Sequence, residues 1–335
     1  MKDAALWTRV TETRSCPLCG GHRHTVVSKR MQHGLDLMTV ICSECSFVFT
    51  NPLPARETYE RFYREAYADY YGHITPKPLR AVTTVEPPQF SKKFSLLTQS
   101  GALSGSRLLE VGPGNGLFLW WAQRRGYEAL GVEPSPEFCS VLAAAGLPYL
   151  QGVLSDVRPG THGLFDFIFM SHVLEHFYDP NEALQHCRSL LKESGILAVE
   201  VPNILKPFRS LDRYSLRYVH PSSFSPRTLQ ALLEKHGFRP LHADEGGADW
   251  KSPQNLFVIA EKQKAVPDQP LSVPAEADQV LRALQDYRRR WRRCLAPKWY
   301  TRSLVLGGRR IVFKLGRPMQ RFFANGPGKI TASGT

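Results

Sequence analysis

The pattern of apolar and polar positions between residues 101 and 262 alternates between strand-like and helix-like stretches. Mainly apolar runs of strand length occupy residues 108–111, 128–132, 165–170, 196–201 and 256–261. Helical patterns lie between them, and Ser135, Asp179 and Ser225 each stand directly before a proline as a start signal. The predicted helices end at Gly126, Gly146, Gly195 and Gly237. Such alternation predicts an α/β fold with a doubly wound, mostly parallel sheet.

The first apolar run stops in a turn with three glycines at alternate positions. Glu110 lies near the end of the run, and Gly112, Gly114 and Gly116 follow before a helical pattern begins. Glycine lets the backbone come close to a ligand, and the first turn of a helix offers unpaired N–H groups. The next strand ends in Glu133, near the spacing at which a carboxylate meets two ribose hydroxyls. The pattern favours a nucleoside site over a plain glycine turn.

These residues resemble motif I of the class I S-adenosylmethionine (SAM) methyltransferases, whose signature is acidic-x-Gly-x-Gly-x-Gly followed by an acidic residue after the second strand. The resemblance implies SAM as the cofactor. Dinucleotide enzymes differ, because their third glycine stands one place later and a nearby acid would repel a pyrophosphate. Cofactor contacts are expected from Glu110, Gly112, Gly114, Gly116, Glu133, Pro134, Ser171 and His172.

Two Cys-x-x-Cys pairs lie near the N-terminus. Cys16 and Cys19 form the first pair and Cys42 and Cys45 the second, with 22 residues between the pairs. In a reducing compartment this spacing predicts four thiolates on one tetrahedral Zn²⁺. Four cysteine ligands leave no open position, so the zinc is expected to be structural. A redox role is the alternative, although neither pair begins a helix after a strand.

Candidate bases follow the fourth and fifth strands of the predicted sheet. His172 and His176 stand four apart, which on a helix would place them on one face, and His220 lies in a proline-rich loop. Histidine suits proton transfer near neutrality because its ordinary pKa is about 6.5. We predict His176 or His220 as general base, the alternative being hydrogen-bonded wall residues. Tyr70 and Tyr71, after a tyrosine-rich helical stretch, are expected to form a lid.

The combination resembles methyltransferases with an N-terminal zinc module that act on nucleotide-linked sugars at carbon, over about residues 16–262. In that family a histidine after the fourth strand falls at His176, a Tyr/His-Glu-His segment falls at Tyr218-Val219-His220, and a lid tyrosine falls at Tyr70 or Tyr71. The resemblance implies a sugar acceptor. Val219 replaces the family's glutamate, and a short basic segment replaces its C-terminal domain, so carbon as the methylated atom is not carried over.

The formal charge of +13 is unevenly distributed. Residues 281–323 hold thirteen Lys or Arg against the single acid Asp286, with aromatic residues between them. This composition predicts a basic amphipathic segment on an anionic membrane surface, with nucleic acid as the competing partner. No apolar run approaches the roughly 20 residues that span a bilayer, and no secretory h-region is present. We therefore expect a cytoplasmic protein with a peripheral contact at the inner membrane surface.

Four parts are expected: a zinc-binding module at 1–50, a helical linker or lid at 51–100, a SAM-dependent methyltransferase domain at 101–262, and a proline-rich linker with a basic amphipathic tail at 263–335. The leading interpretation is methyl transfer from SAM to a small molecule or glycan, specifically a sugar or sugar-containing metabolite. One alternative is an RNA methyltransferase that uses the zinc module and the tail. Another is a non-catalytic SAM-binding module that docks a partner. The choice between O-, N- and C-methylation stays open.

Overall fold

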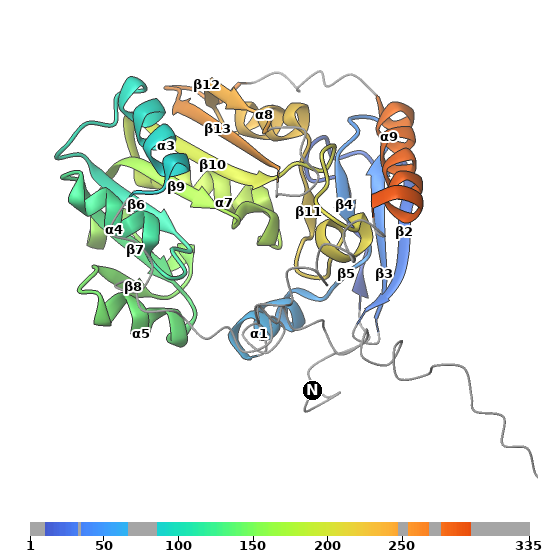
Figure 1. The fold of residues 1–335 in the computed structure, drawn as a ribbon, viewed down its shortest axis with the longest axis horizontal. Coiled ribbons are helices and arrows are strands. Elements are labelled where there is room, and N and C mark those ends of the chain that lie inside the picture. Colours follow the sequence, from blue (N-terminus) through green and yellow to red (C-terminus); the bar gives the residue numbers. More distant parts are fainter. Residues whose placement is uncertain (1–10, 33–34, 66–85, 247–253, 268–275, 296–335) are drawn as a thin grey trace, which may run out of the picture.

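A computed structural model describes residues 11–32, 35–65, 86–246, 254–267 and 276–295. Its largest element is a seven-stranded sheet in the order β12-β13-β10-β9-β6-β7-β8 (Figure 1). The strands are β6 (Arg107–Val111), β7 (Glu128–Glu133), β8 (Tyr149–Gln151), β9 (Phe165–Ser171), β10 (Leu191–Pro202), β12 (Phe238–Asp244) and β13 (Asn255–Lys262). β10, β9, β6, β7 and β8 run parallel, while β13 runs antiparallel to β10 and to β12. The predicted mostly parallel sheet is confirmed.

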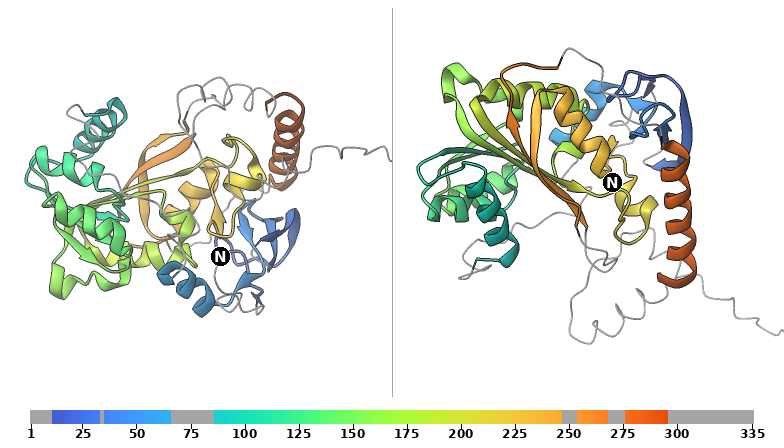
Figure 2. Two further views of the ribbon diagram at one scale, coloured as in Figure 1. Left: turned by 60° about the horizontal axis from the view of Figure 1, so that its bottom comes forward. Right: turned by 90° about the horizontal axis from the view of Figure 1, so that it is seen from above.

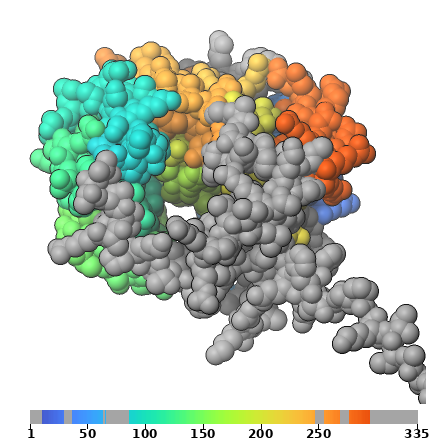
Figure 3. All heavy atoms as spheres, viewed as in Figure 1, coloured from blue at the N-terminus to red at the C-terminus, as the bar shows by residue number. Residues whose placement is uncertain are grey.

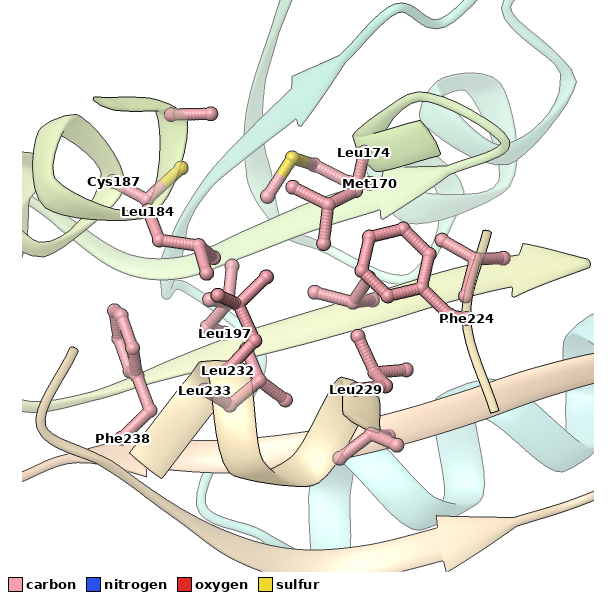
Figure 4. Close-up of a cluster of buried hydrophobic side chains, with 14 of the residues drawn as sticks. Met170, Leu174, Leu184, Cys187, Leu197, Phe224, Leu229, Leu232, Leu233 and Phe238 are labelled. Carbon is pink, nitrogen blue, oxygen red and sulfur yellow. The ribbon is translucent and has the colours of Figure 1, made fainter. Parts of the chain in front are cut away.

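Helices cover both faces of this sheet because side chains alternate along each strand. They are α3 (Pro88–Gln99), α4 (Leu117–Arg124), α5 (Pro136–Ala144), α6 (Pro159–His162), α7 (Pro180–Leu190) and α8 (Pro226–Lys235), with a 3-10 turn η3 (Leu154–Asp156). Leu109 of β6 packs in one core with α7 and α8, whereas its neighbour Leu108 packs in a second core with α3 and α4. Figure 4 shows the first core, in which Leu184 and Leu232 from the two helices meet the sheet.

The helix starts follow the local signals in the sequence. The side-chain oxygens of Ser135, Asp179 and Ser225 each accept a hydrogen bond from a backbone N–H in the first turn, and a proline occupies the first helical position after each of them. These contacts satisfy N–H groups that have no partner within the helix. The predicted helices after these three residues are therefore present where the caps place them.

The end of α7 and two strands differ from the prediction. The predicted helix end near Gly195 is wrong, because α7 ends at Leu190 and β10 begins at Leu191, which already pairs with β9 before a register shift. β8 and β12 were not predicted as strands. They lie at the two edges of the sheet, and their residues are partly exposed, so neither forms a continuous apolar run.

A second, antiparallel sheet has the order β11-β4-β3-β2. Its strands are β2 (His24–Gln32), β3 (Leu35–Cys42), β4 (Val48–Thr50) and β11 (Ser222–Ser223), followed along the chain by β5 (Leu53–Pro54), which pairs with β1 (Thr11–Glu12), and by α1 (Arg56–Glu65). β4 confirms the short strand expected after the second cysteine pair. β11 comes from far along the chain, so residues after β10 complete the N-terminal sheet.

The predicted basic helix is present as α9 (Ala277–Arg290), which continues into a π-helical turn η6 (Trp291–Leu295). α9 lies against the N-terminal sheet in both views of Figure 2, and Figure 3 shows it on the opposite side of the surface from α3. Val280 and Leu284 are buried in a cluster with Ile41 and Val48. The apolar face of α9 is thus covered by protein, and Arg288 forms an ion pair with Asp212 at 2.7 Å, so only the other arginines of the helix face away from these contacts.

Within the described ranges, no helix combines the length and apolar character needed to cross a bilayer. Residues 296–335, which carry most of the predicted membrane-binding segment, lie outside the described part of the chain. The membrane contact through residues 281–323 therefore stays a prediction.

Candidate functional site

The glycine turn connects the end of β6 to α4 at the carboxyl edge of the sheet. Gly112, Gly114 and Gly116 have φ angles of 66°, 55° and 75°, a left-handed conformation that L side chains rarely adopt. A Cβ at Gly112 would lie 2.8 Å from a methyl carbon of Val173, whereas a Cβ at Gly114 would meet nothing within 4 Å among the described atoms. The turn is therefore tight at its base and open at its tip, where a ligand can approach the backbone.

Glu133 ties this turn to the start of the next helix. Its carboxylate accepts hydrogen bonds from the Gly114 N–H at 3.0 Å and from the Ser135 N–H at 2.9 Å. Burial raises the pKa of Glu133, and the two N–H donors oppose that rise. A carboxylate has about four acceptor positions, so two remain for the ribose hydroxyls that the sequence assigns to it. Pro134 lies between Glu133 and Ser135 in the chain and is exposed.

Glu110 lies directly below the turn and is almost fully buried. Burial raises the pKa of its carboxyl to about 8, although the Leu119 N–H and the Lys93 ammonium favour the charged form. Its Oε2 has no hydrogen-bond partner among the described residues. The ligand-free protein therefore keeps Glu110 protonated at neutral pH, whereas the sequence assigned it a negative charge.

The end of β9 brings Ser171 and the exposed His172 to a polar cluster around the buried Glu200. Ser171 Oγ donates to Glu200 Oε2 at 2.5 Å, and Lys93 Nζ forms an ion pair with the same oxygen at 2.6 Å. Asn255 Nδ2 bonds both Glu200 Oε1 and His172 Nε2. Lys93, Glu200 and Asn255 were not predicted, although a carboxylate inside the apolar run 196–201 was a visible signal. His172 has a φ of 57°, an uncommon conformation for a histidine.

The expected helix carrying His172 and His176 on one face is not formed. His172 is left-handed, and only a 3-10 turn, η4 (Leu174–His176), follows it. The two histidines instead lie on either side of the Glu175 carboxylate, whose Oε1 is 3.4 Å from His172 Nδ1 and 3.9 Å from His176 Nε2. Glu175 is 2% exposed and was missed by the sequence analysis, although it lies between the two histidines in the chain.

The two candidate bases are brought together. The rings of His176 and His220 are 4.8 Å apart between centroids. Burial lowers the pKa of both, to about 3 for His220, so both imidazoles are neutral near pH 7. Burial opposes the charge of Glu175, but the neighbouring His172, whose Nδ1 lies 3.4 Å from Oε1, holds its pKa at about 2. The cluster therefore combines one carboxylate with neutral ring nitrogens.

Outer contacts orient both rings. His220 Nδ1 lies 2.9 Å from the Ser215 carbonyl, which can only accept, so Nδ1 carries the proton and Nε2 has the lone pair. The phenol of Tyr63 lies 2.8 Å from His176 Nδ1, and Tyr59 donates to the His176 carbonyl at 2.9 Å. The sequence indicated α1 tyrosines as a packing face, which Tyr59 confirms by its burial. It gave no sign that Tyr63 contacts a histidine.

The four N-terminal cysteines converge. Cys16 Sγ lies 3.5 Å from Cys45 Sγ, and Cys19 Sγ lies 3.5 Å from Cys42 Sγ, with all four sulfurs within 4.8 Å of one another. A tetrahedron of sulfurs at about 2.3 Å from Zn²⁺ has edges of roughly 3.8 Å, so the spacing fits that ion. Backbone N–H groups at 3.4 Å point at the Cys19 and Cys42 sulfurs, as expected around thiolates.

The first cysteine pair is fastened to the sheet-covering helices. The Pro17 carbonyl accepts from Asn181 Nδ2 of α7 at 3.1 Å and from Lys235 Nζ of α8 at 2.8 Å. The Lys235 ammonium also interacts electrostatically with Cys16 and its neighbours. A zinc–tetrathiolate centre carries net negative charge, which this ammonium would offset.

The predicted lid residues Tyr70 and Tyr71 lie outside the described residues.

Comparisons with known proteins identify a methyltransferase domain in this chain. Residues 77–243 match the family model described as "Methyltransferase domain". The chain is similar to the ubiquinone biosynthesis O-methyltransferase of Xylella fastidiosa strain M23, with 32% identity over 137 residues that cover 39% of this chain and 53% of that protein. The corresponding protein of Caulobacter vibrioides is 31% identical over 147 residues, covering 38% and 58%. The chain thus spans about half the length of the curated relatives it matches.

Among solved structures, the chain is similar to 1,6-didemethyltoxoflavin-N1-methyltransferase from Burkholderia thailandensis. The TM-score is 0.49 at 16% identity, and the match covers 65% of this chain and 96% of that one. A SAM-dependent methyltransferase from Mesorhizobium loti has a TM-score of 0.42 at 18% identity, covering 51% and 97%.

Proposed function

We propose, from the premise that residues 77–243 are a class I SAM-dependent methyltransferase domain, that the whole chain transfers a methyl group from SAM to a small molecule. The observation that carries this proposal is the convergence of the open glycine turn, Glu133 and the segment after β9 at one carboxyl edge of a doubly wound sheet. Ligands of such sheets bind beyond the carboxyl ends of strands where the strand order reverses, which here is between β6 and β9.

On the cofactor side, the backbone of the glycine turn would approach the nucleoside and Glu133 would accept hydrogen bonds from the ribose hydroxyls. Glu110 would face the positive charge of SAM, whose sulfonium and ammonium groups favour an ionised carboxylate nearby. Pro134, Ser171 and His172 would complete the cofactor's surroundings. These residues belong to three consecutive strand ends of the sheet, so one bound molecule can reach them all.

On the acceptor side, His176 and His220 would face the group to be methylated. Methyl transfer from a sulfonium is an in-line displacement, so the protein must align the two reactants and, for a hydroxyl acceptor, accommodate the proton that leaves. A sugar or sugar-containing metabolite is the proposed acceptor class, because the chain resembles methyltransferases that act on nucleotide-linked sugars. The same resemblance assigns Tyr70 or Tyr71 to the lid. Val219, in place of that family's glutamate, favours oxygen or nitrogen over carbon.

A second acceptor class is the phenolic ring of a quinone precursor. The curated relatives are named for O-methylation in ubiquinone biosynthesis and share about a third of the matched residues with this chain.

The proposed Zn²⁺ at the four cysteines would hold the N-terminal module together and take no part in the reaction. A cytoplasmic location and a peripheral contact through the arginines of residues 281–323 complete the proposal.

The test is a labelled-SAM assay on the full chain with four acceptor pools: nucleotide sugars, lipid-linked glycans, phenolic quinone precursors and total RNA. Labelling of either glycan pool supports the sugar class, and labelling of the phenols supports the second candidate. Label in RNA alone would mean an RNA methyltransferase, and SAM binding without turnover on any pool would mean a non-catalytic module. His186→Gln, at a histidine on α7 whose ring bonds the Val157 carbonyl, is a matched control for His176→Gln and His220→Gln.

A further inference from the structure

The last turn of the basic helix α9 lies beside the loop that carries His220. This loop follows β10 and contains one π-helical turn, η5 (Leu211–Ser215), a rare conformation that is frequent at functional sites. The carbonyl of Ser215, the last residue of that turn, accepts the hydrogen bond from His220 Nδ1 at 2.9 Å. The orientation of the His220 ring therefore depends on where η5 lies.

Two side chains of α9 hold this turn and the residue before it. Arg288 contacts the Asp212 carboxylate with two prongs, since Nη2 donates to Oδ1 at 2.7 Å and Nε donates to Oδ2 at 3.1 Å. The Nη1 of the same guanidinium donates to the Val27 carbonyl of β2 at 2.9 Å. The phenol of Tyr287 donates to the Arg209 carbonyl at 2.7 Å. A two-pronged guanidinium–carboxylate contact fixes orientation as well as distance.

The ion pair belongs to a partly buried network. The side chains of Arg288 and Asp212 are 18% and 26% exposed, and Ser28 Oγ also donates to Asp212 at 2.9 Å. Leu211 of the same turn is buried in one cluster with Leu284 of α9. An isolated surface ion pair holds its partners weakly, whereas a two-pronged pair within a network keeps them in one geometry. The contact between α9 and η5 is therefore specific as well as apolar.

The other end of α9 is fastened to the N-terminal module and to α8. The Glu276 N–H, directly before the helix, donates to Ser46 Oγ at 2.8 Å. The Glu276 carboxylate forms an ion pair with Arg227 at 3.3 Å. Because both ends are attached, α9 can act as a fixed support for η5.

We propose that Arg288 is a positioning residue for the acceptor side. Its contact with Asp212 holds η5, and the Ser215 carbonyl of that turn holds His220 as the Nδ1–H tautomer, with the lone pair on Nε2. This inference deepens the proposed function and rests on it for the place of the acceptor, but not for the state of the His220 ring. It gives the basic segment a role within the protein in addition to the proposed membrane contact.

The first measurement reads the His220 ring directly. Full-length protein, purified with zinc supplied and studied without lipid or acceptor, is labelled with nitrogen isotope in its histidines. Long-range proton–nitrogen NMR correlations distinguish the two neutral tautomers, and a His220→Gln variant assigns the signals. Wild type is expected to show the Nδ1–H tautomer at His220. Arg288→Met and Asp212→Asn should each produce a mixture of both tautomers.

The second measurement is kinetic and uses an acceptor found by the labelled-SAM assay. Arg288→Met and Asp212→Asn should lower kcat/KM for the acceptor about 10- to 100-fold, because a displacement of about 1 Å at a reacting centre has an effect of that size. Both should leave the SAM Kd within about twofold. Arg239→Met, which removes the ion pair with Glu261 in the large sheet, is the matched control and should change neither quantity.

A conservative variant keeps the test decisive if Arg288→Met does not fold. Arg288→Lys retains the charge and loses the two-pronged contact, so it should recover only part of the tautomer signal and of the acceptor kcat/KM. Unchanged His220 signals in Arg288→Lys and Asp212→Asn would overturn the proposal, even if both lowered the melting temperature. Equal losses in SAM binding and in acceptor turnover would also overturn it, since α9 would then stabilise the whole fold. If no acceptor pool is methylated, the proposed function fails, while the NMR measurement still decides whether Arg288 orients His220.

Discussion

SAM binding should release a proton from Glu110. Burial raises the pKa of this carboxyl to about 8 in the ligand-free protein, so at pH 7 about nine in ten molecules carry the proton. A ligand cation placed about 5 Å away at an effective dielectric constant of about 20 favours the ionised form by roughly 3 kcal/mol, which lowers the pKa by about 2. The protonated fraction at pH 7 then falls to about one in ten.

The expected release at pH 7 is therefore about 0.8 proton per SAM bound, and the SAM affinity should rise roughly 25-fold between pH 6 and pH 8. Titration calorimetry in buffers of different ionisation enthalpy measures the release directly. Glu110→Gln should remove it and flatten the pH dependence. Glu137→Gln, an exposed acid at the start of α5, is the matched control and should leave both unchanged. Equal proton release by wild type and Glu110→Gln would refute the reasoning.

The same carboxyl affects the stability of the ligand-free protein. Its folded pKa is above the unfolded value of about 4.5, so the folded protein holds a proton that the unfolded chain has released between those two pH values. Its contribution to stability is full below pH 4.5 and is lost as pH rises towards 8, by up to about 5 kcal/mol. Denaturant titrations of wild type and Glu110→Gln across this window should therefore converge at low pH and diverge at high pH, with the variant the more stable.

Four other contacts can be tested in the same way. Gly112→Ala should weaken SAM binding because its methyl would press on a valine side chain at a positive φ, whereas Gly160→Ala, with open space, should not. Lys93→Met should cost about 3 kcal/mol of unfolding free energy, and adding Glu200→Gln should recover part of it. Leu284→Asp should cost about 3 kcal/mol by placing a carboxylate in the α9 contact, and an unchanged denaturation midpoint would contradict that contact. Chelating the proposed Zn²⁺ of the cysteine cluster should lower the melting temperature and raise the acceptor KM more than the SAM Kd.

The sequence predicted those parts of the fold that depend on neighbouring residues. A serine or aspartate before a proline caps a helix through its own first turn, and a continuous apolar run identifies a strand that is buried on both faces, as β9 is. The glycine turn belongs to this class as well, because a positive φ is a property of single residues. The end of α7, in contrast, does not depend on neighbouring residues alone. Gly195 is a local stop signal, but pairing of Leu191 with β9 ends the helix five residues earlier.

The acceptor-side cluster depended on contacts between distant parts of the chain. His176 and His220 were predicted as separate candidates, and only the fold places their rings 4.8 Å apart. Tyr63 lies 113 positions before His176, and its helix showed only an apolar packing face. Glu175 was passed over because a single acid next to a histidine has no distinguishing local pattern. Glu175 stands out only because its carboxylate is buried, and that burial cannot be read from the residues next to it.

The N-terminal module is joined to this cluster through backbone contacts. The Pro221 carbonyl, next to His220, accepts from the Thr50 N–H of β4 at 2.9 Å and from Arg14 Nη2 at 3.0 Å. β11 then follows and pairs with β4, so the position of His220 depends on the N-terminal sheet, whose strand β3 ends at Cys42. The glycine turn, in contrast, is tied to the large sheet itself, where the Gly114 N–H donates to Glu133 at the end of β7. Loss of the proposed Zn²⁺ from the four N-terminal cysteines should therefore disturb the acceptor side first, even though four cysteine ligands leave no open position for substrate on that ion.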